Sequence, residues 1–123
     1  MRILPEMKLP PQAQQLIMQM QNLQQQLQNI MIQKESLTAQ HIEIERALTE
    51  LKKLSDKDEV YKAVGPILVR SNKKELEKEL AGKNETVGVR IKSLEGQEEK
   101  SKKQMKEIQE KLEGMIKSSE KST

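Results

Sequence analysis

Apolar residues recur with a seven-residue period through the first half of the chain, in two series offset by four positions. The first series is Leu16, Leu23, Ile30, Leu37, Ile44 and Leu51. The second is Met20, Leu27, Lys34, His41 and Leu48, with two polar members. These are the d and a positions of a heptad repeat, the seam along which helices pack, and they predict a coiled-coil helix over residues 10–54. Pro10 and Pro11 suit its first turn, and the Ser-Asp-Lys-Asp run at residues 55–58 ends it.

The second half carries the same repeat in a weaker form, which predicts a second helix over residues 73–117. Its d positions are Leu80, Val87, Leu94, Ser101, Ile108 and Met115. Its a positions are Asn84, Ile91, Glu98, Met105 and Leu112. Four glycines fall inside this helix, and each costs about 1 kcal/mol relative to alanine. Packing against the first helix must therefore hold the second one together.

Between the two helices, residues 59–71 show the pattern of a strand, a turn and a second strand. Two β-favouring runs, 60–64 and 67–69, flank the Gly-Pro pair. A lone hairpin is marginally stable, and its edges expose backbone groups without partners. Because the chain offers no other strand, we expect an obligate oligomer in which this hairpin pairs with hairpins of other subunits. The residues expected to carry this assembly are Val60, Tyr61, Val64, Gly65, Pro66, Ile67, Leu68 and Val69.

The two helices can fold back antiparallel about the hairpin in one register that brings every a position opposite a d position. In this register His41 faces Val87, and Leu16 faces Leu112. The predicted fold class is mainly α, a long antiparallel two-helix coiled coil with one β-hairpin at the connection. The expected organisation is a single domain over residues 1–123, with a helix at 10–54, a hairpin at 59–71, a helix at 73–117 and flexible ends at 1–9 and 118–123.

The amino-acid composition argues against several classes of function. One third of the 123 residues are charged, Tyr61 is the only aromatic residue, and there is no cysteine. Such a chain has no conventional globular core, no disulfide and no thiolate metal ligand. His41, the single histidine, lies at an a position and fits a seam residue better than a metal ligand or a pH switch. We expect no catalysis, metal or cofactor, because no phosphate-binding loop or acid–base pair occurs and two packed helices offer no concave pocket.

Charge and hydropathy indicate where the protein is located in the cell and which classes of partner it binds. The net charge is +3, with lysine and glutamate interspersed except for a lysine-rich patch at residues 100–106. A solvated helix face explains this pattern, and nucleic-acid binding has little support without stacking aromatics or an arginine stripe. No signal-peptide core or membrane-length apolar run occurs. We therefore expect a soluble cytoplasmic protein without membrane or nucleic-acid partners.

The hairpin segment Val-Tyr-Lys-Ala-Val-Gly-Pro-Ile-Leu-Val-Arg at residues 60–70 resembles that of the beta class of prefoldin subunits. The Gln-rich helix that begins with Leu-Pro-Pro-Gln-Ala-Gln at residues 9–14 extends the resemblance, as does Glu-Thr-Val-Gly-Val-Arg-Ile-Lys at 85–92. In having a single hairpin the chain resembles the beta class, because alpha-class subunits carry a second hairpin. The start at residues 5–11 resembles the archaeal branch, but the hairpin core is shared with eukaryotic relatives, so the source stays open.

The resemblance implies a heterohexamer of two alpha-class and four beta-class subunits, whose hairpins form a double β-barrel platform that carries six coiled coils. It implies an ATP-independent molecular chaperone, a holdase that captures unfolded proteins at the coiled-coil tips and transfers them to a group II chaperonin. The implied partners are therefore unfolded proteins, an alpha-class subunit, other beta subunits and the chaperonin, and no cofactor is implied.

The residues themselves also indicate a client-binding surface at the helix ends away from the hairpin. Ile17, Met18 and Ile116 fall there at e and f positions that face water, and flexible methionine suits irregular partners. The seam residues at this end could simply close the coiled coil. A scaffolding coiled coil that binds no clients is the alternative function. The expected client-binding residues, called the tip residues below, are Leu9, Leu16, Ile17, Met18, Met20, Leu112, Met115 and Ile116.

Overall fold

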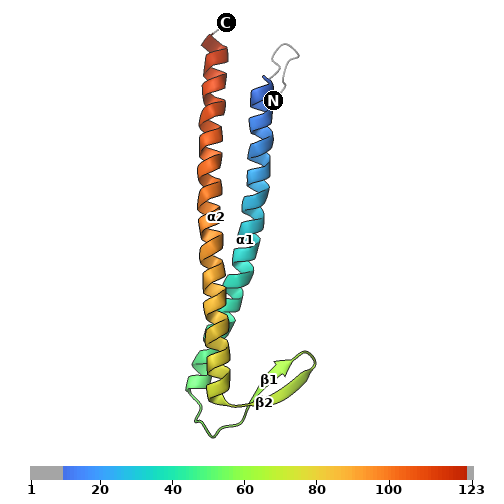
Figure 1. The fold of residues 1–123 in the computed structure, drawn as a ribbon, viewed down its shortest axis with the longest axis vertical. Helices are drawn as coiled ribbons and strands as arrows, with labels where there is room; N and C mark the ends of the chain where they lie inside the picture. The colour runs from blue at the N-terminus through green and yellow to red at the C-terminus, as the bar shows by residue number, and fades with distance from the viewer. Residues whose placement is uncertain (1–9, 122–123) are drawn as a thin grey trace. The chain divides into compact units, whose positions relative to one another are not determined.

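The computed structural model describes residues 10–121 (Figure 1). In chain order it contains helix α1, Pro11–Lys52; strand β1, Val60–Val64; strand β2, Ile67–Ser71; and helix α2, Lys73–Lys121. Two long helices with a two-stranded antiparallel hairpin between them confirm the predicted fold class. The chain divides into two compact units, a terminal unit made of Met1–Ile32 and Glu95–Thr123, and a hairpin unit made of Gln33–Leu94.

Local hydrogen bonds set the ends of α1. At its start the carbonyl oxygen of Pro10 accepts a hydrogen bond from the Gln14 amide at 3.1 Å, so the helix begins directly after the first proline. At its end the Leu54 amide bonds at 3.1 Å to a carbonyl only three residues back, which tightens the last turn. The helix therefore spans residues 11–52, within the predicted range of 10–54.

Asn72 caps the start of α2. Its Oδ1 accepts a hydrogen bond from the Glu75 amide at 2.8 Å, and its Nδ2 donates to Glu75 Oε2 at 3.3 Å. This reciprocal pair is a variant of the capping box, which satisfies an amide that the first turn of a helix leaves without a partner. The Leu76 amide then bonds to the Asn72 carbonyl oxygen at 3.0 Å and begins the helical ladder. The chain thus leaves β2 and enters α2 through a single residue.

The last residues of α2 correct the predicted boundary. We expected the helix to end at residue 117 and a flexible tail to follow, but α2 continues to Lys121. The run Met-Ile-Lys-Ser-Ser-Glu-Lys at residues 115–121 contains neither glycine nor proline, so no residue there favours a turn over continued helix. The other stretches predicted to be flexible, 1–9 and 122–123, lie outside the described residues.

The hairpin is closed by a two-residue turn. β1 and β2 pair antiparallel, and Val64 opposite Ile67 is the last pair before the turn. Gly65 has a φ of 57°, whereas Pro66, like every other described residue that is not glycine, has a negative φ. A positive φ at only the first central residue defines a type II′ turn, whose twist suits a tight hairpin. The Gly-Pro pair thereby fixes the register of the two strands.

A small apolar cluster anchors the hairpin to the helices within the hairpin unit. Val60, the first residue of β1, packs with Leu51 near the end of α1 and with Leu76 in the first turn of α2. Leu54 packs against this cluster, and its carbonyl oxygen accepts a hydrogen bond from Lys73 Nζ at 2.8 Å. In this unit the two helices therefore run antiparallel and meet at the base of the hairpin (Figure 1).

The predicted heptad positions are the covered ones in both units. Every a and d residue of the two series in the described part of the chain is buried or half-buried. Burial extends to Ser101, a polar residue at a d position. The buried apolar residues are Ala13, Ile30, Leu37, Ile44, Leu51, Val60, Leu76, Val87, Leu94 and Ile108. The apolar contacts thus follow the seam of two packed helices, as in a coiled coil.

Three polar residues bond to one another at the seam of the hairpin unit. His41 Nδ1 donates to Asn84 Oδ1 at 2.7 Å, and Asn84 Nδ2 donates to Glu45 Oε1 at 2.7 Å. Asn84 therefore lies beside one turn of α1, in agreement with the predicted register, which places His41 opposite Val87. A polar residue at an a position specifies the register of a coiled coil, because any other register leaves its side chain without these partners.

Replacing Gly82 with alanine should stabilise the protein. A Cβ at this position meets nothing within 4 Å, and glycine inside a helix costs about 1 kcal/mol relative to alanine. We expect Gly82→Ala to raise the free energy of unfolding by about 0.5–1 kcal/mol, measured by urea denaturation followed by circular dichroism. The control is Gly65→Ala. A Cβ at this position also meets nothing within 4 Å, but the backbone has a φ of 57°, so this substitution should lower the free energy of unfolding by about 1 kcal/mol. Effects of the same sign at both positions would contradict this explanation.

Candidate functional site

One face of the hairpin is fully open to solvent. Cross-strand partners share a face, so the register places Tyr61 with Arg70 and Ala63 with Leu68 on this side. All four side chains are exposed, and Leu68 is 74% exposed. Only two strands pair in the described part of the chain, so each strand also keeps one edge without a ladder partner. This face and these two edges form a candidate assembly surface.

The other face of the hairpin is partly covered by the chain itself. Val64, Ile67 and Val69 on this face are exposed, as are the two turn residues. Val60, by contrast, is only 7% exposed, because it belongs to the apolar cluster at the base of the hairpin. The side chain of Val60 therefore holds the hairpin on the helices, and its predicted part in assembly stays a prediction.

Ion pairs add polar links around the hairpin. Arg70 lies 3.1 Å from Glu59 Oε1, and the Tyr61 hydroxyl donates to the other oxygen of the same carboxylate at 3.1 Å. Lys62 Nζ on β1 lies 3.4 Å from Glu79 Oε1 on α2. Exposed pairs of this kind contribute at most about 1 kcal/mol each. The apolar cluster, rather than these charges, therefore positions the hairpin.

The tip residues fall into two groups within the terminal unit. Met18 is 64% exposed and Ile116 is 52% exposed, so both apolar side chains face water as expected. Ile17 is half-buried, which is less exposure than its e position predicts. Leu9 lies outside the described residues. The remaining four are half-buried at seam positions: Leu16, Met20, Leu112 and Met115.

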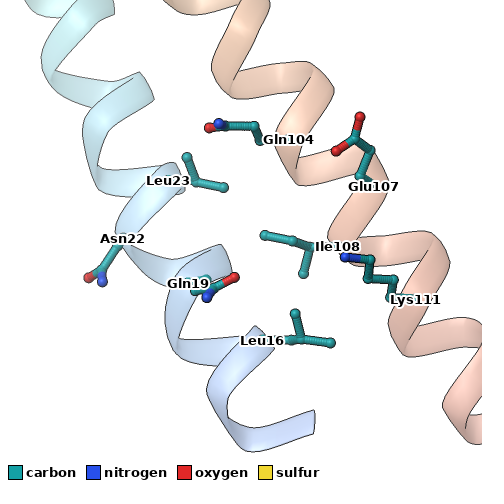
Figure 2. Close-up of a pocket in the computed structure, with 8 residues that line it drawn as sticks. All are labelled: Leu16, Gln19, Asn22, Leu23, Gln104, Glu107, Ile108 and Lys111. Carbon is teal, nitrogen blue, oxygen red and sulfur yellow. The ribbon is translucent and has the colours of Figure 1, made fainter. Parts of the chain in front are cut away.

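An open crevice of about 390 Å³ lies between α1 and α2 in the terminal unit (Figure 2). Leu16 and Leu23 from α1 and Ile108 from α2 are directed toward one another across it and form an apolar floor. Gln104 extends from α2 toward Leu23, and Gln19 lines the crevice on the α1 side. The volume falls within the range of small binding pockets in proteins.

This crevice corrects the expectation that two packed helices offer no concave pocket. Heptad spacing shows which side chains face the partner helix, but it does not give the distance between the helices, and that distance decides whether a gap opens. One signal was present in the sequence, because Gln19 and Gln104 both occupy g positions beside the seam. Long polar side chains at such positions border any gap between the helices.

The described residues present open apolar and amide surfaces. Residues 10–121 contain no group of three or more His, Cys, Asp or Glu side chains that could hold a metal ion. Neither α1 nor α2, as far as the structure describes them, is long and apolar enough to cross a membrane. The surface presents unpaired strand edges, exposed aliphatic and thioether side chains, and a crevice with an apolar floor.

Comparisons with known proteins agree on one family. The family model for prefoldin subunits matches residues 14–119. The prefoldin subunit beta of Archaeoglobus fulgidus is 47% identical over 109 residues, which cover 89% of this chain and 94% of the relative. That of Thermococcus gammatolerans is 38% identical, with 89% of this chain and 93% of the relative covered.

A solved structure extends the similarity to the fold. The crystal structure of the prefoldin beta subunit from Thermococcus strain KS-1 matches with a TM-score of 0.81 at 36% identity. The match covers 87% of this chain and 94% of that chain. The family match at residues 14–119 covers the whole hairpin and all of both helices except the first three residues of α1 and the last two of α2. The chain therefore belongs to the prefoldin subunit family, and its relatives place it in the beta class.

Proposed function

We propose that this chain is a subunit of an ATP-independent holdase, which captures unfolded polypeptides with its tip residues and passes them to a group II chaperonin. A chaperone role follows from the family. The observation that carries the holdase mechanism is the exposure of Met18 and Ile116 in one compact unit. Exposed apolar side chains that gather in a patch mark sites of protein–protein contact.

The chemistry of these side chains suits a client without fixed structure. Met18 has an unbranched thioether side chain that adapts to irregular apolar partners, and Ile116 adds aliphatic surface. A contact of this size is weak by itself. Several subunits that contact one client at once act through effective concentration, which gives useful capture and still permits release without nucleotide hydrolysis.

Assembly through the hairpin is the second part of the proposal. The open face around Leu68 and the two unpaired strand edges support pairing with hairpins of an alpha-class subunit and of other beta subunits. Closing such hairpins into a barrel removes every edge, which a lone hairpin cannot do. The hairpins then form a platform, and the tip residues remain available to clients. We propose that this assembly acts in the cytoplasm, where it meets newly made chains and the chaperonin.

A scaffolding coiled coil receives less support. Helices that dimerise along their length need apolar side chains at e and g positions beside the seam. On α1 only two e positions are apolar, Ile17 and Met31. Four successive g positions are glutamines, namely Gln19, Gln26, Gln33 and Gln40. The flanks of the seam are therefore too polar for a second helix to pack along them.

Aggregation of a chemically denatured test protein, followed by light scattering after dilution, tests the proposed function. We expect this chain, assembled with an alpha-class prefoldin subunit, to suppress aggregation at stoichiometric amounts and to the same extent with and without ATP. An unrelated coiled-coil protein at equal concentration is the control. Suppression that depends on ATP would contradict the proposal, and assembly without any suppression would favour the scaffold.

A further inference from the structure

The two helices of the terminal unit differ sharply in charge. Residues 11–33 of α1 include ten glutamines and two asparagines but no charged residue. Residues 95–121 of α2 are rich in lysine and glutamate. One third of the whole chain is charged, yet all the side chains of this segment of α1 are apolar or amide. The segment forms one wall of the crevice.

Three amide side chains line the crevice, and two of them, Gln19 and Gln104, lie beside its apolar floor, whereas Asn22 points away from α2. Gln104 extends from α2 toward Leu23, and Gln19 lines the crevice from α1 (Figure 2). Within residues 10–121, neither amide has a hydrogen-bond partner in the chain. Each offers one carbonyl oxygen that accepts and two N–H groups that donate. The crevice thus combines an apolar floor with donors and acceptors that the fold itself does not use.

A glutamine amide is chemically matched to a peptide group. Each peptide bond presents one N–H and one C=O, so a glutamine can bond it whatever the neighbouring side chains are. In a folded protein these backbone groups are already paired, whereas an unfolded segment presents them to solvent. Side-chain amides beside an apolar floor can therefore bind an unfolded chain in preference to a folded one, whatever the amino-acid sequence of that chain.

We propose that the crevice binds an extended, uncharged segment of a client polypeptide. One aliphatic side chain of the client rests on Leu16, Leu23 and Ile108, and its flanking peptide groups bond to Gln19 and Gln104. This inference rests on the proposed holdase function and deepens it, because it names the client backbone as the feature that is recognised. It also separates two kinds of contact, a specific one in the crevice and an adaptable one at Met18 and Ile116.

The charges near the crevice favour a neutral occupant. Lys111 reaches toward the gap and Glu107 lies at its border, so the lining has one charge of each sign. A phosphate or carboxylate ligand would find a single cation rather than the clustered donors that hold such groups. A charged peptide would lose hydration against the uncharged wall of α1 without a compensating partner. A second copy of α1 does not suit the crevice. Its backbone N–H and C=O groups are already hydrogen-bonded within its own helix, so they cannot bond to Gln19 and Gln104.

Two recombinant unstructured polypeptides made of glycine, serine and asparagine, with leucine at regular intervals, test this inference. In one of them each leucine is flanked on both sides by proline, which removes the neighbouring N–H donors and keeps the leucine side chain. Fluorescence anisotropy measures the affinity of both for the complex of this chain with an alpha-class prefoldin subunit. We expect the proline-free polypeptide to bind about tenfold more tightly, because the other one lacks those backbone hydrogen bonds.

The double variant Gln19→Met and Gln104→Met should bring the ratio of the two affinities close to one. Methionine keeps the length and helix propensity of glutamine but cannot bond a peptide group in this way. Because the ratio is compared, any change in apolar contact cancels. The control variant Gln25→Met makes the same chemical change at an f position, away from the seam, and should leave the ratio as it is. If the double variant does not assemble, Gln104→Met alone should lower the ratio.

A ratio that stays unchanged in the double variant, or that falls equally in the control, would overturn backbone recognition in the crevice. The same preparations are also mixed with a denatured test protein. This second measurement distinguishes failure of the crevice proposal from failure of the proposed holdase function. A wild-type complex that suppresses aggregation but binds both polypeptides equally would overturn only the crevice proposal. A complex that captures neither client would overturn both proposals.

Discussion

Replacing Leu68 with aspartate should abolish assembly with an alpha-class subunit and leave the helices of the single chain folded. Leu68 is 74% exposed and shares its face of the hairpin with Ala63 and Tyr61. In the single chain an aspartate there stays in water, so stability should hardly change. In an interface formed by this face, the carboxylate would be buried without a partner, at an effective cost of several kcal/mol. A loss of about 3 kcal/mol per interface weakens association more than a hundredfold.

Light-scattering mass of the mixed subunits measures this effect, and circular dichroism of the isolated variant confirms that its helices persist. The matched control is Val89→Asp, which places the same charge at an exposed apolar position of α2 in the hairpin unit. We expect the control to assemble like the wild type. A Leu68→Asp chain that forms the wild-type complex at the same concentration would show that this hairpin face is not the subunit interface.

Replacing Met18 and Ile116 with serine should weaken client capture and leave assembly intact. Full burial of an aliphatic side chain of this size contributes about 1.5–3 kcal/mol, and partial burial on an adaptable client contributes less. A combined loss of about 1.5 kcal/mol in each subunit lowers the affinity of one contact about tenfold. Several subunits contact one client, so the loss in overall affinity should be larger still. Ile17 is kept, because it is half-buried and its replacement would also disturb packing.

Suppression of the aggregation of a denatured test protein, titrated against complex concentration, measures this loss. The matched control replaces Ile42 and Val89 with serine, since both are exposed apolar side chains of the hairpin unit. Light scattering must give the same mass for both double variants and the wild type. Full suppression by an intact Met18 and Ile116 variant would place the client surface elsewhere, for instance at the exposed pair Met31 and Ile32.

Heptad spacing predicted the helices and their covered positions because burial in a two-helix seam repeats every seven residues. Even polar members of the series obey it, as His41 and Asn84 do by bonding to each other within the seam. The Gly-Pro pair predicted the turn for an equally local reason, since only glycine adopts the positive φ of a type II′ turn without strain. These features depend on the order of residues along the chain and on little else.

Other features depend on distances between elements, which the sequence pattern does not contain. Val60 carries the same β-branched signal as Val64, but only Val60 reaches the apolar cluster beside Leu51. The crevice depends on how far apart α1 and α2 lie, which heptad positions leave open. The last turn of α2 was missed for a simpler reason, since a polar run was interpreted as a frayed end although it contains no helix-breaking residue.

The most direct test of hairpin-driven assembly into a holdase is the light-scattering mass of this chain alone and after mixing with an alpha-class prefoldin subunit. We expect a discrete complex, with the mass of two alpha-class and four beta-class subunits, that forms only on mixing and suppresses aggregation of a denatured protein without ATP. Masses that stay unchanged on mixing would contradict assembly through the hairpin, and with it the proposed function.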